Sequence, residues 1–119
     1  MMYEIKVMNA LTEFLEEIKG KTVISSWIEC EYQRDSSLNI MANRERIVYL
    51  RLGYTPAEYQ NFIDKIDFVY EADYEGDDLY GVIWYADGSW SERHEYDGLN
   101  IWHYCKIPEY PPECIDGSI

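Results

Sequence analysis

Residues 80–106 read YGVIWYADGSWSERHEYDGLNIWHYCK, and this stretch decides the fold class. It contains two Asp-Gly pairs, at positions 87–88 and 97–98, and each pair lies between runs of aromatic and β-branched residues. Asp-Gly is a preferred sequence for two-residue hairpin turns, because both central residues of such a turn need a positive φ. We therefore predict a three-stranded antiparallel meander with strands at Tyr80–Ala86, Ser89–Tyr96 and Leu99–Lys106.

The predicted two-residue turns also set which residues face one another in the meander. They place Tyr85 opposite Trp90 and Ile83 opposite Glu92 in the first hairpin, and Glu92 opposite His103 in the second. One face would then carry both histidines of the protein, a carboxylate and a thiol. The predicted members of this face are Ile83, Tyr85, Trp90, Glu92, His94, Tyr96, Leu99, Ile101, His103 and Cys105.

This face permits an enzyme hypothesis, in which Glu92, His94 and His103 form the centre of a small metal-dependent hydrolase. A Cys/His nucleophile pair that includes Cys105 is a related possibility. The alternative is a half-buried sheet face with a Glu–His cross-strand pair and an inert thiol. We favour this alternative, because such spacing arises easily in any alternating strand. The sequence predicts no catalytic residue, no metal ligand and no cofactor.

Upstream of the meander, helical and strand patterns alternate. Apolar residues recur at helical spacing over Asn9–Lys19. A second helix begins with a capping box at Thr55–Glu58 and ends near Asp67 or Phe68. Two further strands are predicted at Thr22–Tyr32 and Arg44–Leu52, where β-branched and aromatic residues alternate. The whole pattern predicts an α+β fold, with two helices packed on an antiparallel sheet of about five strands that ends in the meander.

The composition predicts a single acidic domain over residues 1–119, with an extended, proline-containing tail at 107–119. There are 23 acidic and 10 basic residues, which give a formal net charge of −13. Such a charge repels nucleic-acid phosphates and anionic membranes, and it attracts basic proteins. We therefore expect a basic protein partner, with no direct binding of nucleic acid or membrane.

The cysteines and the N-terminal sequence bear on the compartment. Cys30, Cys105 and Cys114 are too widely spaced for a disulfide framework or a zinc-ligand pattern. The first residues lack a secretory signal, and no run approaches the ~20 apolar residues of a membrane span. We expect the cytoplasm, where thiols stay reduced.

The most acidic stretch runs from residue 64 to residue 78 and joins the second helix to the meander. It begins like a calcium-binding loop at Glu71, but the first ligand position should be Asp, and Val82 occupies the twelfth, where a bidentate Glu belongs. We interpret the stretch instead as a binding surface, because carboxylates at fixed spacing can stand in for phosphates and interspersed tyrosines can anchor an interface. The predicted partner-binding residues are Asp64, Asp67, Glu71, Asp73, Tyr74, Glu75, Asp77 and Asp78.

Residues 84–108 resemble a C-terminal pattern of small bacteriophage proteins. In that pattern a D-G-x-W strand, here residues 87–90, runs into R-x-E-Y-D-G, here residues 93–98, and a tryptophan strand and a Cys/Pro tail follow. The likeness covers about the last third of the chain and brings no established activity. It implies a phage origin. By analogy of size and charge, it also suggests an inhibitor of host defence of the anti-CRISPR or anti-restriction type.

The leading hypothesis is therefore a non-enzymatic inhibitor in the host cytoplasm. It would mimic a nucleic acid and occupy the basic nucleic-acid-binding surface of a host protein. The alternatives that remain open are the metal-dependent hydrolase described above, a toxin immunity protein, and a homo-oligomeric phage accessory protein.

Overall fold

The computed structural model describes residues 7–31, 46–71, 78–96 and 99–115. They form an α+β fold with a five-stranded antiparallel sheet, a two-stranded ribbon and three helices, which confirms the predicted fold class. In chain order the elements are β1 (Val7–Asn9), α1 (Ala10–Glu17), β2 (Val23–Glu31), β3 (Arg46–Leu50), α2 (Pro56–Ile66), β4 (Val69–Glu71), β5 (Asp78–Tyr85), β6 (Trp90–Tyr96), β7 (Leu99–Cys105) and α3 (Pro112–Ile115).

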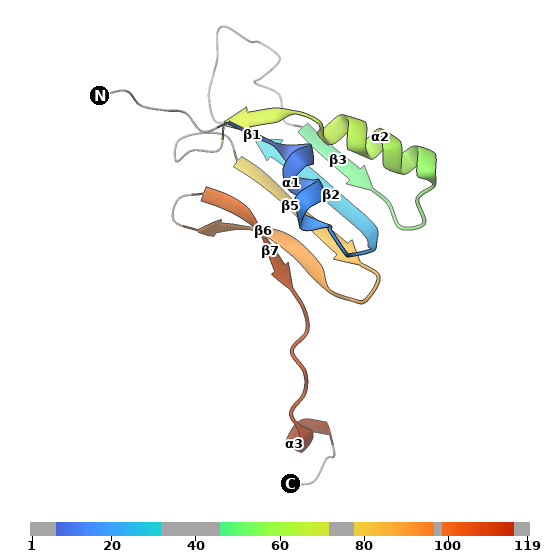
Figure 1. The fold of residues 1–119 in the computed structure, drawn as a ribbon, viewed down its shortest axis with the longest axis vertical. Helices are drawn as coiled ribbons and strands as arrows, with labels where there is room; N and C mark the ends of the chain where they lie inside the picture. The colour runs from blue at the N-terminus through green and yellow to red at the C-terminus, as the bar shows by residue number, and fades with distance from the viewer. Residues whose placement is uncertain (1–6, 32–45, 72–77, 97–98, 116–119) are drawn as a thin grey trace, which may run out of the picture.

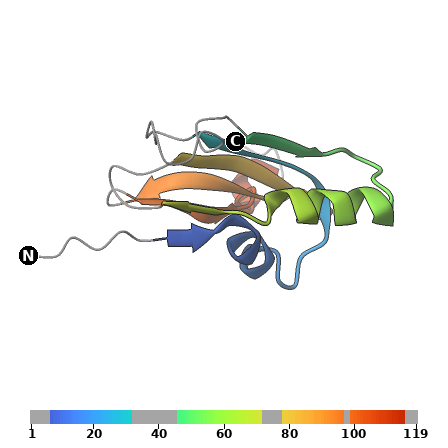
Figure 2. The ribbon, with the colours of Figure 1, turned by 90° about the horizontal axis from the view of Figure 1, so that it is seen from above.

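The large sheet has the strand order β3-β2-β5-β6-β7, and its last three strands are the predicted meander. β1 pairs with β4 in a separate ribbon. These two strands were not predicted, because three residues are too few to show an alternating pattern. Both long helices and the ribbon lie on the same side of the large sheet (Figures 1 and 2). We call this side the helix-covered face and the opposite side the open face.

An apolar core fills the space between the helices and the sheet. Phe14 of α1 and Phe62 of α2 meet edge to face, with their ring centroids 5.5 Å apart. The sheet contributes the fully buried side chains of Ile28, Leu79 and Ile83. Burial of each such side chain stabilises the fold by roughly 1.5–3 kcal/mol.

Local capping interactions define where the two long helices begin. The Asn9 side chain accepts a hydrogen bond from the Thr12 backbone N–H at 2.9 Å and caps α1. Thr55 and Glu58 form the predicted reciprocal capping box at α2, with Pro56 at the first helical position. These bonds satisfy backbone donors that have no partner inside the helix.

The structure corrects the predicted register of the first hairpin by one residue. The Tyr85 N–H donates to the Ser89 carbonyl at 2.9 Å, so three residues form the loop, and Gly88 has a φ of 89°. Ile83 consequently faces Ser91, not Glu92, and Trp90 faces Trp84, not Tyr85. A three-residue loop with a left-handed glycine is the next most common hairpin connection.

The second hairpin has the predicted register, with Glu92 opposite His103 and His94 opposite Ile101. Its Asp-Gly turn at residues 97–98 lies outside the described residues. Together the two registers place Ile83 and Tyr85 on the helix-covered face, where both are buried in the core. The predicted single face of the meander therefore divides between the two sides of the sheet.

A polar network on the helix-covered face joins α1 to the meander. The Arg93 guanidinium lies 3.4 Å from the Glu13 carboxylate, and only 1% of the Arg93 side chain is exposed. Arg93 also donates to the carbonyl oxygens of Leu79 (3.1 Å) and Asn100, and to the Tyr70 hydroxyl (3.2 Å). The Tyr70 hydroxyl donates in turn to Glu13, and burial raises the pKa of this tyrosine well above its usual value.

The chain leaves the sheet after β7 and extends away from the body of the molecule (Figure 1). Residues 106–111 have no regular secondary structure, and the four-residue α3 follows them. The tail at 107–119 was predicted to be extended; residues 107–111 are irregular, but residues 112–115 form α3, which was not predicted. All described residues of the tail, 107–115, are exposed. No helix among the described residues is long and apolar enough to cross a membrane.

Candidate functional site

The open face of the sheet is the candidate site, because no helix or strand of the described part of the chain covers it (Figure 2). On β2, buried Ser26, Ile28 and Cys30 alternate with Trp27 and Glu29, which point to the other side. Residues that are paired across neighbouring strands lie on the same side of the sheet, so the strand pairings identify the residues of the other four strands that share this side. The open face consists of Ser25, Trp27, Glu29, Glu31, Ile47, Tyr49, Asp78, Tyr80, Val82, Trp84, Trp90, Glu92, His94, Ile101, His103 and Cys105.

Aromatic side chains dominate the centre of the open face. Trp27 is paired across the strands with Tyr49, and Trp84 is paired with Trp90. Tyr49 is 66% exposed, Trp84 is 40% exposed and Tyr80 is 38% exposed, although the opposite face of the same strands is buried. Contiguous exposed aromatic surface of this kind typically marks an interaction site.

Carboxylates surround the aromatic residues at one end of the open face. Glu29 lies opposite Tyr80, and Glu31 lies opposite Asp78. The pKa of Tyr80 is raised, first by partial burial, then by the charge and hydrogen bond of Asp78, and further by Glu31 and Glu29. The open face also carries Glu92, and no lysine or arginine is among its residues. The surface is therefore both aromatic and negative.

The residues of the enzyme hypothesis, Glu92, His94, His103 and Cys105, share the open face. The His94 and His103 rings lie 5.7 Å apart, and the Cys105 Sγ lies 3.5 Å from Glu92 Oε1. Partial burial, followed by the hydrogen bond and charge of Glu92, raises the pKa of the Cys105 thiol, which disfavours the nucleophilic thiolate. Within the described ranges, no three or more His, Cys, Asp or Glu side chains come together in a way that could hold a metal ion.

The structure describes half of the predicted acidic site. Asp64 lies on α2 and accepts a hydrogen bond from Gln60 at 2.9 Å. Asp67 follows α2 as its C-cap and accepts one from Asn9 at 3.1 Å. Glu71 lies on β4, which belongs to the separate ribbon, whereas Asp78 begins β5 on the open face. The remaining predicted residues, Asp73, Tyr74, Glu75 and Asp77, lie outside the described residues.

Sequence reasoning missed most of the open face. The residues Trp27, Glu29 and Tyr49 were not predicted as site residues, although their alternation with buried neighbours is visible in the sequence. The helices decide which side of the alternation is buried, and their packing is not encoded in the strands themselves.

Comparison with known proteins gives no match for this chain, either among protein-family models, among curated proteins or among solved structures. The bacteriophage resemblance of residues 84–108 therefore stays a prediction.

Proposed function

We propose that this protein is a non-enzymatic binding protein that holds a basic macromolecular partner on the open face of its sheet. One observation carries the proposal: exposed aromatic rings and carboxylates share a sheet face that no described helix or strand covers and that has no lysine or arginine among its described residues. The formal net charge of −13 adds a long-range attraction for cationic surfaces.

The chemistry of the open face suits arginine in particular. A guanidinium can stack on an exposed ring such as Trp84 or Tyr49 and can donate hydrogen bonds from its edge to a carboxylate. The cluster of Glu29, Glu31 and Asp78 around Tyr80 supplies such carboxylates next to an aromatic ring. Tyrosine, tryptophan and arginine are also the residues that contribute most to interface energies. A second copy of the chain fits the open face less well, because two acidic faces repel each other.

The finer proposal concerns the partner. We propose that it is a host protein that binds DNA or RNA, and that this chain acts as a phage-encoded inhibitor that mimics a nucleic acid. The support is the resemblance of residues 84–108 to bacteriophage proteins, together with the acidic segment at 64–78. Among the described residues of that segment, Asp78 is the one that also belongs to the open face, so it is the point at which the segment would join the proposed surface.

Binding of a nonaarginine peptide, measured by tryptophan fluorescence, tests the proposed surface. The test variant combines Glu29→Gln, Glu31→Gln and Asp78→Asn. The control variant combines Glu16→Gln, Glu109→Gln and Glu113→Gln, and removes three exposed carboxylates outside both the open face and the acidic segment. We expect the test variant to bind the peptide about tenfold more weakly than the control does. Each lost ion pair between a carboxylate and an arginine contributes up to about 1 kcal/mol. Equal weakening in both variants would mean that only the net charge matters.

Competition with nucleic acid tests the finer proposal. A basic host protein captured by the wild-type chain, but not by the test variant, should be released by an excess of duplex DNA or structured RNA. A captured partner that binds this chain and the nucleic acid simultaneously would refute nucleic-acid mimicry and leave the binding surface in place.

A further inference from the structure

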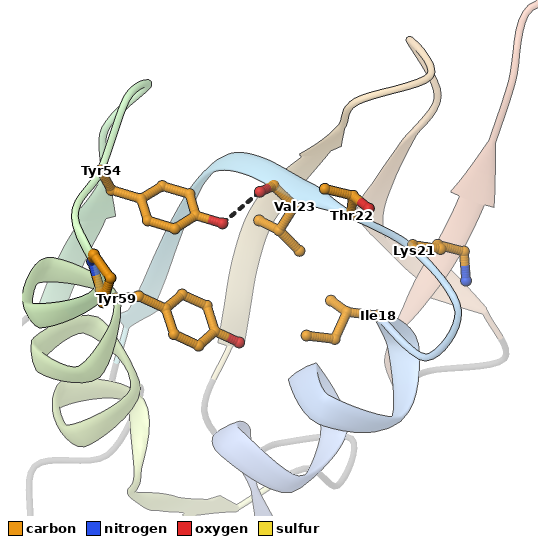
Figure 3. Close-up of a pocket in the computed structure, with 7 residues that line it drawn as sticks. Ile18, Lys21, Thr22, Val23, Tyr54 and Tyr59 are labelled. Carbon is orange, nitrogen blue, oxygen red and sulfur yellow. Dashed lines mark hydrogen bonds between the residues drawn. The ribbon is translucent and has the colours of Figure 1, made fainter.

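A groove with a volume of about 420 Å³ lies where the end of α1, the start of β2 and the start of α2 meet (Figure 3). It is separate from the open face. Its apolar lining comes from Ile18, Val23, Tyr54, Pro56 and Tyr59, and Lys21 lies at its rim. The groove therefore offers aromatic and aliphatic walls with one cation at the edge.

Two stacked tyrosines give the groove a fixed wall. The rings of Tyr54 and Tyr59 have centroids 5.6 Å apart and an interplanar angle of 26°. The Tyr54 hydroxyl donates to the Val23 carbonyl at 2.5 Å, which holds this ring against the start of β2. Figure 3 shows Ile18 across the groove from the Tyr59 ring. An aromatic wall of this kind is the feature by which proteins recognise proline-rich segments in the polyproline II conformation.

The chain itself contains such a segment. Residues 107–111 read IPEYP, with prolines at two of the five positions, and they have no regular secondary structure before α3 begins at Pro112. The large apolar side chains of Ile107 and Tyr110 are exposed, although an isolated tail gains nothing from exposing them. Proline-rich segments have little conformational entropy to lose on binding, because the polyproline II conformation is already favoured.

Charge and position also match the groove to the tail. Glu109 and Glu113 make the tail acidic, and Lys21 is the cation at the groove rim. The Lys21 Nζ lies 4.8 Å from the ring centroid of Tyr104, which is three residues before the tail begins. The base of the tail and the groove rim are therefore neighbours. Two copies related by a two-fold axis could each place a tail in the groove of the other.

Docking of the tail into the groove of its own chain is disfavoured by the tail sequence. It would need a sharp reversal immediately after Cys105. Pro108 instead favours an extended backbone at Ile107, and the chain runs away from the body in Figure 1. We propose that residues 107–111 of one copy bind in the groove of a second copy, so that the protein forms a dimer by mutual tail exchange.

Sedimentation equilibrium of the full-length protein tests this proposal. The measurement should use physiological salt, because a Debye length of about 8 Å screens the repulsion between the acidic chains. The tail variant combines Ile107→Ser with Tyr110→Ser, which cannot unfold the domain because both side chains are already exposed. The groove variant is Tyr59→Ala. The control is Leu52→Ser, which removes an exposed apolar side chain remote from the tail.

We expect a concentration-dependent dimer for the wild type and the control. The tail and groove variants should each dissociate at least about tenfold more readily, as for an anchor residue that contributes more than 1 kcal/mol. An equal mixture of the two variants should form a heterodimer, because it retains one intact tail and one intact groove. A wild type that is monomeric at all concentrations, or a dimer that the tail variant leaves unchanged, would overturn the proposal.

Discussion

Replacement of Arg93 by methionine would remove the donor on which the polar network beneath α1 depends. The guanidinium donates to the Leu79 and Asn100 carbonyls and to the Tyr70 hydroxyl, and it pairs with Glu13 at 3.4 Å. Methionine keeps an unbranched apolar stem of similar length but offers no hydrogen-bond donor. The substitution therefore isolates the polar contribution from the packing contribution.

The magnitude follows from burial. The exposed fractions are 1% for the Arg93 side chain and 15% for Glu13, so water can replace the lost partner only at the Glu13 end. Removal of one member of a buried ion pair costs roughly 3–5 kcal/mol, and much of this cost comes from the charge that remains without a partner. A domain of this size typically has about 5–15 kcal/mol of stability in total. We expect Arg93→Met to lower the free energy of unfolding by about 4 kcal/mol.

Urea unfolding, followed by tryptophan fluorescence and circular dichroism, measures this change. The double variant Arg93→Met/Glu13→Leu removes both charges and should recover more than about 1 kcal/mol relative to the sum of the single variants. Arg51→Met, at an exposed arginine, is the matched control and should change stability by less than about 0.5 kcal/mol. A decrease in the free energy of unfolding of less than about 1 kcal/mol for Arg93→Met would refute the view that this network stabilises the packing of α1 on the meander.

Three further predictions concern the packing and the titration of single residues. Gly81→Ala should lower stability by roughly 1–3 kcal/mol in thermal unfolding. The Cβ added at position 81 would lie 2.6 Å from the Trp27 carbonyl oxygen and 3.1 Å from Trp102 Cη2. An unchanged melting temperature would contradict this close approach. Burial raises the pKa of Tyr85 from 10.0 to about 12, so its neutral form stabilises the fold fully below pH 10, and that stability is lost as the pH rises to about 12. Tyr85→Phe should flatten this decline in an alkaline unfolding series, and an equally steep decline in the variant would assign it to other groups. At pH 8, iodoacetamide should modify Cys105 more slowly than the exposed Cys114. Glu92→Gln should increase the rate of modification at Cys105 but not at Cys114, because the hydrogen bond and charge of Glu92 help to raise the pKa of the Cys105 thiol.

Local signals in the sequence predicted the two long helices and the register of the second hairpin correctly, but not α3. The capping box at Thr55 is a short-range interaction that the residues themselves specify, and α2 begins where it predicts. The first hairpin shows the limit of such signals, because Asp87-Gly88 is compatible with loops of two or three residues. The structure has the longer loop, in which the Asp87 carboxylate accepts hydrogen bonds from the Ser89 N–H and hydroxyl. Those contacts favour the longer loop and move every residue of β5 by one position relative to the predicted pairing.

The open face could not be assigned from the sequence, for a different reason. On β3, Val48 and Leu50 alternate with Ile47 and Tyr49, so both sides of the strand are apolar. Only the packing of α2 against β3 decides that Val48 and Leu50 are buried. The acidic segment at 64–78 was visible in the composition. Its described residues nevertheless separate, because β4 leaves α2 for the ribbon and β5 returns to the large sheet.

The length of the three-residue loop at 86–88 decides which side chains of β6 and β7 face the helices and which face the open side of the sheet. Deletion of one residue there would create the two-residue turn and rotate β6, together with its partner β7, by one position. Arg93 and Ser91 would then turn toward solvent, while Glu92 and His94 would turn toward the helices. Substitutions in this loop should therefore be tolerated far better than a change in its length, and homologous chains that conserve the fold should conserve that length.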